Sequence, residues 1–152
     1  MVKIVKEADL PFSPAQLFNA VSDYKQFPKV FPSIRTSTVL AQDANGTDVD
    51  MAFNVPPAIA NFLPAASQKL HATEIKDKEI DLKSTGGAMK DMHIHWTFNE
   101  VSPGKTHVKF EMDYETGMNP AISATVKIFI SRNTKDVLEN LAEHVRKTSP
   151  KP

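Results

Sequence analysis

The sequence predicts an α+β fold in which a curved antiparallel sheet of six to seven strands wraps around one long C-terminal helix, with two short helices after the first strand. Three observations support this prediction: short alternating segments separated by turn residues, a proline-rich corner after the first segment, and a last segment with helical periodicity. Short turns join antiparallel neighbours, and one amphipathic helix covers only one face of their sheet. The 152 residues suffice for a single domain, 1–152, with a hydrophobic core.

Residues 2–10 alternate between polar and apolar side chains, which is typical of a half-buried strand, and they end at a proline. A short helix is predicted directly afterwards. Ser13 is its expected N-cap, Pro14 occupies the first helical position, and Gln16 is placed to complete a capping box.

The segment that follows this helix predicts a second short helix and a tight aromatic corner. Asp23 is placed to cap a further turn. Phe27 and Phe31 each precede a proline, which favours an extended backbone at both residues. We expect both rings to face the interior of the fold.

The middle of the chain predicts the rest of the sheet. Residues 34–43 and 47–55 are two strand-like runs joined by Asn45–Gly46, a strong hairpin signal. The segment 56–67 is apolar and proline-broken, unlike an ordinary surface connection; with the aromatic corner at 27–32 it is a candidate gate to an interior cavity, and whether it forms a lid stays open. Gly86–Gly87 is interpreted as a turn or bulge rather than a phosphate-binding loop. Further strands are predicted at about 68–76, 79–84, 92–101 and 106–114.

The last part of the chain predicts the long helix. Asn119 and Pro120 supply an N-cap and a first helical position, and apolar residues then recur at helical spacing to about Lys147. The first half is rich in β-branched residues, which have a weaker helix propensity than the residues of the second half. We therefore expect a kink or break near Ser131–Asn133.

Composition and charge exclude several classes of function. The 18 basic residues balance 18 acidic ones, so no excess charge attracts a nucleic-acid backbone. The absence of cysteine excludes a disulfide framework, a thiolate zinc site and a thiol nucleophile. No apolar run approaches the ~20 residues of a membrane span. We expect a cytoplasmic protein, monomeric or dimeric, with no nucleic-acid partner and no stable membrane insertion, and transient membrane contact stays open.

The run MHIHWTF (92–98) allows two interpretations, a metal site at its two histidines or the wall of a hydrophobic chamber. Strand parity places His93 and His95 on one face and the large apolar residues on the other. Matching the faces of the last hairpin pairs His95 with Asp113 and His93 with Glu115, on the convex, solvated side. We expect no metal and no cofactor. The matched apolar pairs are Ile94 with Tyr114, Trp96 with Met112, and Phe98 with Phe110.

No catalytic group is predicted. The chain has no serine in a glycine-flanked elbow such as G-x-S-x-G. Tyr114, expected to face inward, is a candidate for a polar contact to a ligand. Arg132 and Asn133 lie at the expected bend of the helix, and two interpretations stay open: both side chains turn towards the cavity, or both are solvated. The other predicted cavity residues are aromatic, methionine and β-branched: Phe27, Phe31, Met51, Phe53, Ile94, Trp96, Phe98, Phe110, Met112, Val126, Phe129 and Ile130.

Two stretches carry a resemblance to a known superfamily. FSPAQLFNAVSDYKQFPKVFP (12–32) has a capped helix followed by an aspartate, an aromatic and an aromatic-proline corner. GGAMKDMHIHWTF (86–98), with HVKFEMDYE (107–115), resembles a Gly-Pro-Phe-Lys segment, a Trp-x-Phe strand and the last strand before the helix, except that Ala88–Met89 replaces Pro-Phe. These patterns resemble the START-like, or SRPBCC, superfamily of helix-grip fold, and within it the branch of coenzyme Q-binding, ribosome-associated toxin-like and polyketide cyclase/dehydrase-type proteins.

The resemblance implies binding and carriage of one hydrophobic small molecule between sheet and helix, such as an isoprenoid quinone, a lipid or a polyketide-like aromatic. Carriage rather than turnover is the favoured interpretation. The alternative is a cyclase/dehydrase-type enzyme, which predicts polar, titrating groups inside the cavity. A further alternative, a protein-interaction module like the ribosome-associated relatives, stays open.

Overall fold

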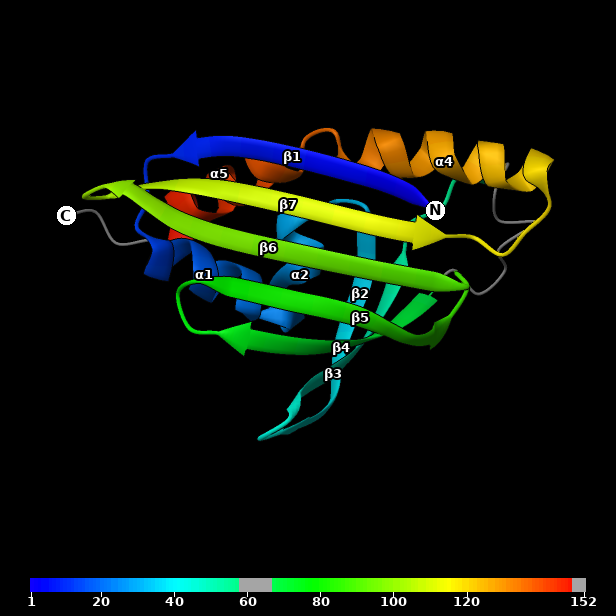
Figure 1. The fold of residues 1–152 in the computed structure, drawn as a ribbon, viewed down its shortest axis with the longest axis horizontal. Coiled ribbons are helices and arrows are strands. Elements are labelled where there is room, and N and C mark those ends of the chain that lie inside the picture. Colours follow the sequence, from blue (N-terminus) through cyan, green and yellow to red (C-terminus); the bar gives the residue numbers. More distant parts are fainter. Residues whose placement is uncertain (58–66, 149–152) are drawn as a thin grey trace.

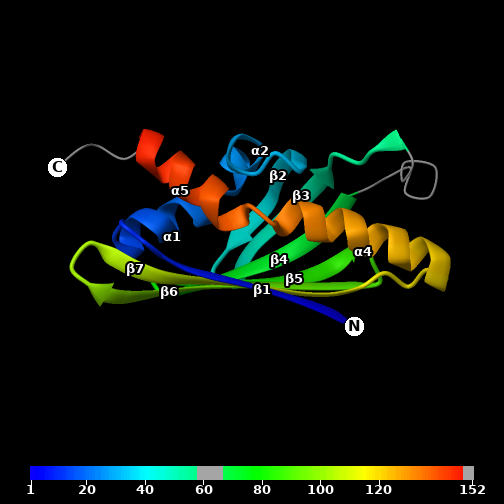
Figure 2. The same cartoon turned by 90° about the horizontal axis from the view of Figure 1, so that it is seen from above.

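The structure has two layers, a curved antiparallel sheet and a set of helices that lie against one of its faces (Figure 2). The computed structural model describes residues 1–57 and 67–148. Most strands alternate buried and exposed side chains, so one face of the sheet packs under the helices and the other is solvated. None of the helices in these ranges has the length and apolar character needed to cross a bilayer.

Seven strands form one sheet in the order β1-β7-β6-β5-β4-β3-β2 (Figure 1). The strands from β2 to β7 form an antiparallel meander, and the last of them, β7, pairs with β1. This arrangement confirms the predicted fold class. The strands are β1 (Val2–Leu10), β2 (Ile34–Asp43), β3 (Gly46–Phe53), β4 (Ser67–Ile75), β5 (Glu79–Gly87), β6 (Asp91–Ser102) and β7 (Lys105–Glu115).

The corner after β1 contains α1 (Pro14–Ser22), the single 3-10 turn η1 (Tyr24–Gln26) and α2 (Phe27–Val30). The predicted capping box of α1 is present, with Ser13 Oγ accepting from the backbone of Gln16 at 3.2 Å. Two local expectations were wrong. Asp23 stands at the N-cap of η1 but its side chain caps nothing, and Phe27 is helical because its proline lies within the first turn of α2, where it is tolerated. Phe31 is extended, as predicted.

The C-terminal helix is divided into α4 (Pro120–Thr134) and α5 (Val137–Thr148). Asn119 caps α4 as predicted, with its side chain accepting from Ile122 N at 2.9 Å. The break lies at residues 135–136, slightly after the predicted position. Thr134 Oγ1 donates to the carbonyl oxygen of Ile130 at 2.9 Å, a back-bond that commonly bends helices.

The pairing of β6 with β7 corrects the predicted register by two residues. His93 lies opposite Asp113 and His95 opposite Glu111. The apolar pairs are Met92 with Tyr114, Ile94 with Met112, Trp96 with Phe110, and Phe98 with Val108. The division of side chains between the two faces is as expected, because an even shift keeps every side chain on its own face.

Glycines mark two irregular points of the sheet. The β2–β3 hairpin turns at residues 44–45, and Gly46, with φ +134°, is the first residue of β3 rather than part of the turn. Gly87, with φ +132°, follows a register shift between β4 and β5, which agrees with the predicted bulge. A Cβ at Gly87 would lie 2.6 Å from the carbonyl oxygen of Ser67, so the two strands approach too closely for another residue.

The core is densest where α5 lies over α1, α2 and β1. Leu141 and Val145 of α5 are buried there together with Leu17 and Val21 of α1. The backbone of α4 has no comparably close neighbour among the described elements. The hydrophobic interior is therefore filled at the α5 end, which leaves room for hollows beneath α4.

Candidate functional site

A hollow of about 80 Å³ lies beneath α4, near the ends of β4 and β5. We call it the methionine cavity, because three flexible methionine side chains form much of its wall. Thioether side chains adopt many conformations at low cost, so this wall can adapt to the shape of a ligand. Its lining residues are Ser33, Phe53, Val55, Gln68, Ala88, Met89, Met92, Met112, Val126, Phe129, Ile130, Asn133 and Thr134.

A second hollow, also about 80 Å³, lies between the aromatic corner and the middle of the sheet. We call it the aromatic cavity. Phe31 packs edge-on against Phe27 at a centroid distance of 5.3 Å and lies 6.0 Å from Trp96, which in turn packs on Phe110 at 4.9 Å. Its lining residues are Phe27, Phe31, Ser33, Ile34, Met51, Phe53, Leu82, Ile94, Trp96, Phe110, Met112, Asn133, Thr134 and Val137.

The two cavities adjoin, since both are lined by Ser33, Phe53, Met112, Asn133 and Thr134. Each is smaller than the roughly 300–1,000 Å³ of common ligand pockets. A single ring or a short branched group matches this size. A larger ligand requires the shared Phe53 and Met112 side chains to move, which would join the cavities into one.

A tyrosine anchors the aromatic corner to the sheet. The Tyr24 hydroxyl donates to Glu74 Oε2 of β4 at 2.6 Å, and the Tyr24 ring packs on Phe27 at 5.6 Å. Burial, followed by the hydrogen bond to the Glu74 carboxylate, raises the pKa of the Tyr24 phenol far above its usual value. The phenol therefore stays neutral, and its bond holds one wall of the aromatic cavity in place.

All of the predicted cavity residues except Phe98 and Tyr114 line one of the two cavities. Phe98 lies further along β6, where its ring packs edge-on against Phe18 of α1 at 6.2 Å. The same face of β6 therefore lines the aromatic cavity at Trp96 and supports α1 at Phe98. Strand parity cannot separate these two environments, because both lie on the buried face of the sheet.

Tyr114 is fully buried but borders neither cavity. It lies at a separate hollow near the start of α4, together with Val2 and Ser123. Its hydroxyl has no hydrogen-bond partner among the described residues, and burial raises its pKa. Tyr114 thus faces inward, as expected, but the structure places it outside the two cavities.

Polar groups in the two cavities are few. Asn133, one of the two polar residues expected near the bend of the helix, lines both cavities, while Arg132 is exposed. Gln68 of β4 lines the methionine cavity and is only 1% exposed. Its Oε1 accepts from the backbone N–H of Met89 at 3.0 Å, and its Nε2 has no partner among the described residues. An unpaired buried donor of this kind costs about 1–3 kcal/mol.

None of the described residues that line the two cavities has a titratable side chain. The polar members are amides and hydroxyls, which can orient a ligand but cannot exchange a proton with it near neutral pH. Thr134 already donates its hydroxyl to the backbone of α4. The chemistry available inside the two cavities is therefore burial of apolar surface with a small number of directed hydrogen bonds.

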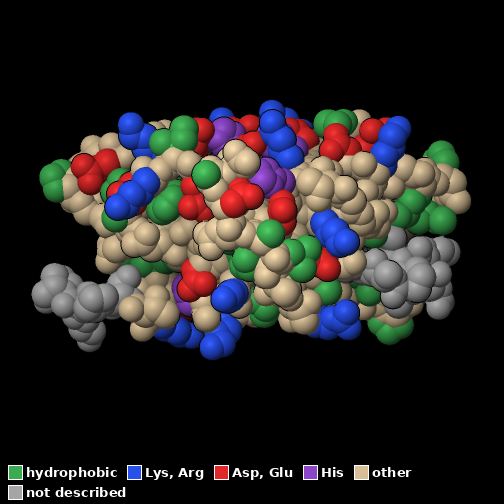
Figure 3. All heavy atoms as spheres, turned by 90° about the horizontal axis from the view of Figure 1, so that it is seen from below, with side chains coloured by type: hydrophobic (Ala, Val, Ile, Leu, Met, Phe, Trp, Pro, Cys, Tyr) green, Lys and Arg blue, Asp and Glu red, His purple; other side chains and the backbone are tan. Residues whose placement is uncertain are grey.

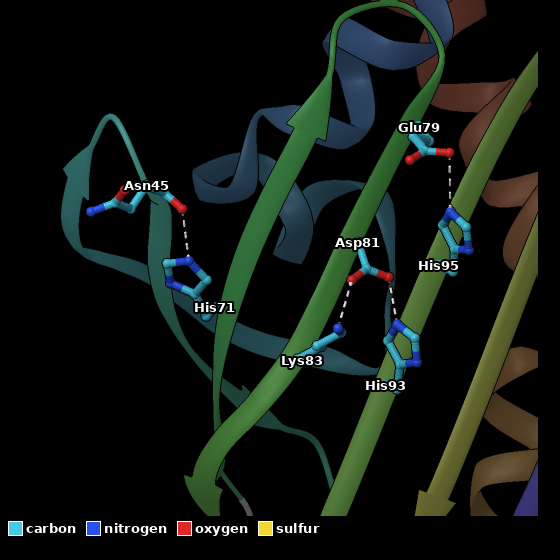
Figure 4. Close-up of polar contacts among 7 residues, drawn as sticks. All are labelled: Asn45, His71, Glu79, Asp81, Lys83, His93 and His95. Carbon is cyan, nitrogen blue, oxygen red and sulfur yellow. Dashed lines mark hydrogen bonds and ion pairs between the residues drawn. The ribbon is translucent and has the colours of Figure 1, made fainter.

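His93 and His95 of β6 lie on the outer face of the sheet, as expected, but their acidic partners are on β5 (Figure 4). His93 bonds to Asp81, and His95 Nε2 lies 3.5 Å from Glu79 Oε2. The two imidazoles stack with a centroid distance of 6.4 Å. The expected pairing with β7 carboxylates is corrected, because the diagonal neighbours on β5 come closer than the residues directly opposite.

The side of the molecule seen in Figure 3 mixes charges of both signs, and histidine side chains lie among acidic and basic ones. His71 Nδ1 lies 2.7 Å from Asp48 Oδ1, and its Nε2 lies 2.9 Å from the carbonyl oxygen of Asn45, remote from the His93 pair (Figure 4). Within residues 1–57 and 67–148, no group of three or more potential ligands is arranged to hold a metal ion.

A sequence model of one family, described as polyketide cyclase / dehydrase and lipid transport, matches residues 10–142. The chain belongs to this family. No curated protein matches the chain at the level of sequence. The predicted resemblance to the polyketide cyclase/dehydrase branch is thereby confirmed.

Several solved structures of other proteins have a similar fold, although their sequences are only 9–15% identical to this one. The Zhui aromatase/cyclase from Streptomyces sp. R1128 is 9% identical, with a TM-score of 0.84 over 98% of this chain and 96% of that one. A START superfamily protein from Mycobacterium smegmatis is 15% identical, with a TM-score of 0.77 over 97% and 99%. Norcoclaurine synthase from Thalictrum flavum is 15% identical, with a TM-score of 0.69 over 99% and 89%.

For this member of the family, sequence reasoning missed Gln68 and Met89 as cavity residues. One signal for Gln68 was available, since it shares a strand face with the buried Leu70 and Ala72, where a polar side chain is unexpected. Met89 follows β5 in a short connection whose position no periodicity predicts. The candidate gate, 56–67, lies almost entirely outside the described residues.

Proposed function

We propose that this chain binds and carries an uncharged hydrophobic small molecule, of the class of isoprenoid quinones, lipids or polyketide-like aromatics, in the two adjoining cavities. The observation that carries the proposal is their lining, which is almost wholly apolar and has no titratable side chain among the described residues. Removing apolar ligand surface from water stabilises such a complex by about 25 cal/mol per Å². A charged ligand would lose its hydration without gaining a counter-charge.

Carriage is favoured over turnover. The family and the aromatase/cyclase neighbour bring a cyclase/dehydrase-type reaction into consideration as the second candidate function. General acid-base catalysis needs a side chain that changes protonation within reach of the substrate. Gln68 and Asn133 are polar without titrating, so they support orientation of a ligand and give no route for proton transfer.

Native mass spectrometry of the purified protein, combined with organic extraction, tests the proposal. We expect a lipophilic compound to co-purify, or a short-chain quinone added to the apo protein to bind with one-to-one stoichiometry. Recovery of the added compound unchanged supports the carrier function. Its conversion into a cyclised or dehydrated product supports the cyclase/dehydrase-type reaction. Absence of both a co-purified compound and quinone binding would refute the carrier.

Two substitutions of the same chemistry locate the binding. Ala88→Phe places a ring in the methionine cavity and should abolish binding of the larger ligands. Ala121→Phe adds the same ring on the exposed side of α4 and should leave binding unchanged. Equal binding by both variants would place the ligand elsewhere on the molecule.

A further inference from the structure

We propose that Gln68 selects the ligand of the methionine cavity, and that this ligand carries a neutral carbonyl oxygen that accepts a hydrogen bond from Gln68 Nε2. The inference rests on the proposed function and deepens it, since it replaces a general hydrophobic molecule with a ketone, quinone or ester of defined orientation. One feature of the cavity wall is unusual: the buried Gln68 amide has its oxygen bonded, while its nitrogen has no partner among the described residues.

The orientation of the Gln68 amide follows from its bonded half. The backbone N–H of Met89 donates to Oε1 at 3.0 Å, and an N–H cannot donate to an NH₂ group. The oxygen is therefore the atom that faces Met89, and Nε2 is the atom whose two hydrogens have no acceptor within residues 1–57 and 67–148.

The surrounding backbone holds the amide in this position. Gly87 pairs with Gln68 across the β4–β5 ladder, and a Cβ at Gly87 would lie 2.8 Å from Gln68 Oε1. The next residue, Ala88, donates its N–H to the carbonyl oxygen of Ser67 at 2.9 Å. The end of β5 thus closes tightly over Gln68, so the amide cannot turn outward to find water.

Gln68 Nε2 differs from the other unpaired polar atoms of the interior. In the described part of the chain, the buried side-chain atoms that make no hydrogen bond belong to Ser37, Gln68, Asp77, His95 and Tyr114. Of these residues, only Gln68 lines either cavity. Among the described residues, its two N–H groups are therefore the buried, unpaired donors that a molecule bound in these two cavities can satisfy.

The chemistry of the walls defines the acceptor. A carboxylate or phosphate would be a stronger acceptor than a carbonyl, but no described lining residue is a cation that could balance its charge. A ketone, quinone or ester oxygen accepts the amide hydrogen without adding charge. The aromatic cavity next to it offers the rings of Phe31 and Trp96 to the apolar remainder of such a molecule.

Three naphthalene derivatives of similar size test this inference by titration calorimetry: 2-acetylnaphthalene, 2-isopropylnaphthalene and 2-naphthoate. The wild-type protein should bind the ketone about tenfold more tightly than the hydrocarbon, the ratio that corresponds to about 1.4 kcal/mol. The carboxylate should bind most weakly. In Gln68→Met, which keeps the length of the side chain but removes the donor, the preference for the ketone should disappear while the hydrocarbon still binds.

Gln42→Met, the same change at an exposed residue of β2, is the matched control and should keep the wild-type preference. The carbonyl stretching frequency of the bound ketone gives a measurement that needs no variant, and we expect it to fall relative to the ketone in an apolar solvent. Equal binding of ketone and hydrocarbon by the wild type, or an unshifted carbonyl band, would overturn the inference but not the carrier. Failure of all three compounds to bind would also overturn the inference, and only together with the absence of a co-purified compound and of quinone binding would it refute the proposed carrier function.

Discussion

The two halves of the C-terminal helix differ in what lies beneath them. α5 is amphipathic in the ordinary way, with Leu141 and Val145 packed on α1, α2 and β1. α4 buries only a narrow stripe of residues, leaves Ile128 56% exposed and borders both cavities. The close packing that stabilises a fold also fills the space that a ligand needs. The C-terminal helix therefore divides the two tasks: α5 stabilises the core, and α4 borders the cavities.

Local chemistry strengthens the same contrast. Glu139 lies in the first turn of α5, and Arg146 and Lys147 lie in its last turn. In these positions their charges interact favourably with the helix dipole and stabilise α5. Lys147 Nζ also lies 3.5 Å from Glu143 Oε1, one turn earlier. α4 has no acidic residue in its first turn and contains several β-branched residues, so its helical structure depends more on the Asn119 cap.

The largest effect is expected at Leu141, which is fully buried in α5. Leu141→Ala should lower the free energy of unfolding by about 3–5 kcal/mol, since the surrounding helices cannot collapse into the space left behind. Urea denaturation followed by circular dichroism measures this. A loss below about 1 kcal/mol would contradict the dense packing assigned to α5.

Val145 and Val126 give a matched pair, because each is 1% exposed and one belongs to each half of the helix. Val145→Ala should cost about 2.5 kcal/mol, the transfer of two methyl groups plus a new void. Val126→Ala should cost about 1.5 kcal/mol, because Val126 already faces the methionine cavity and its truncation creates no separate void. Equal losses of stability in the same urea titrations would show that α4 is packed as tightly as α5.

Phe129 should separate ligand binding from stability. It is half-buried on α4 and lines the methionine cavity, so Phe129→Ala should cost only about 1 kcal/mol of unfolding free energy. The dissociation constant for 2-acetylnaphthalene should rise roughly tenfold, as one wall of the site is lost. A large loss of stability with unchanged affinity would show that Phe129 stabilises the fold and does not contribute to ligand binding.

The helix caps test the same contrast at a smaller scale. Ser13→Ala, at the start of α1 beneath α5, should lower the unfolding free energy by about 1 kcal/mol. Asn119→Ala should lower it by about 0.5 kcal/mol, because the first turn of α4 can fray without disturbing the core. Hydrogen exchange should show that this fraying is confined to residues 120–123. Faster exchange throughout α5 would contradict the independence of the two halves.

The smallest effect concerns pH. Hydrogen bonds raise the pKa of His71, chiefly through Asp48, and the pKa of His107, through Glu7 and then Asp9. A raised pKa in the folded state stabilises the protein fully below about pH 6.5, the unfolded value, and the contribution disappears as the pH rises through the folded value. Stability should therefore fall slightly between pH 6 and pH 8.

Both histidines are partly exposed, pair with exposed carboxylates and lie on the sheet face away from the helices, so this fall is small and the helix variants should share it. His107→Gln should reduce the fall without altering the difference between Val145→Ala and Val126→Ala. Urea denaturation at several pH values measures both quantities. A steeper fall in the α4 variants alone would connect the outer face to the cavities.

The alternation of buried and exposed residues predicted the faces of the last hairpin but not its register. The turn pairs Ser102 with Lys105, which by itself would place apolar side chains of β6 opposite solvated ones of β7. One extra residue in either strand restores the match, and the structure places that bulge at Val101 of β6. A bulge in β7 would have produced the predicted pairing, and both choices bury the same face.

Periodicity, caps and turn residues were sufficient for the order of the elements, for the inward face of each strand and for most of the cavity wall, because these depend on neighbours in the chain. The positions of Phe98, Tyr114 and Gln68 relative to the cavities were decided only by the tertiary structure. Whether a buried side chain meets a helix, a hollow or an unpaired amide depends on which distant element lies above it. Local sequence cannot show that α5 fills the space above its part of the sheet while α4 does not.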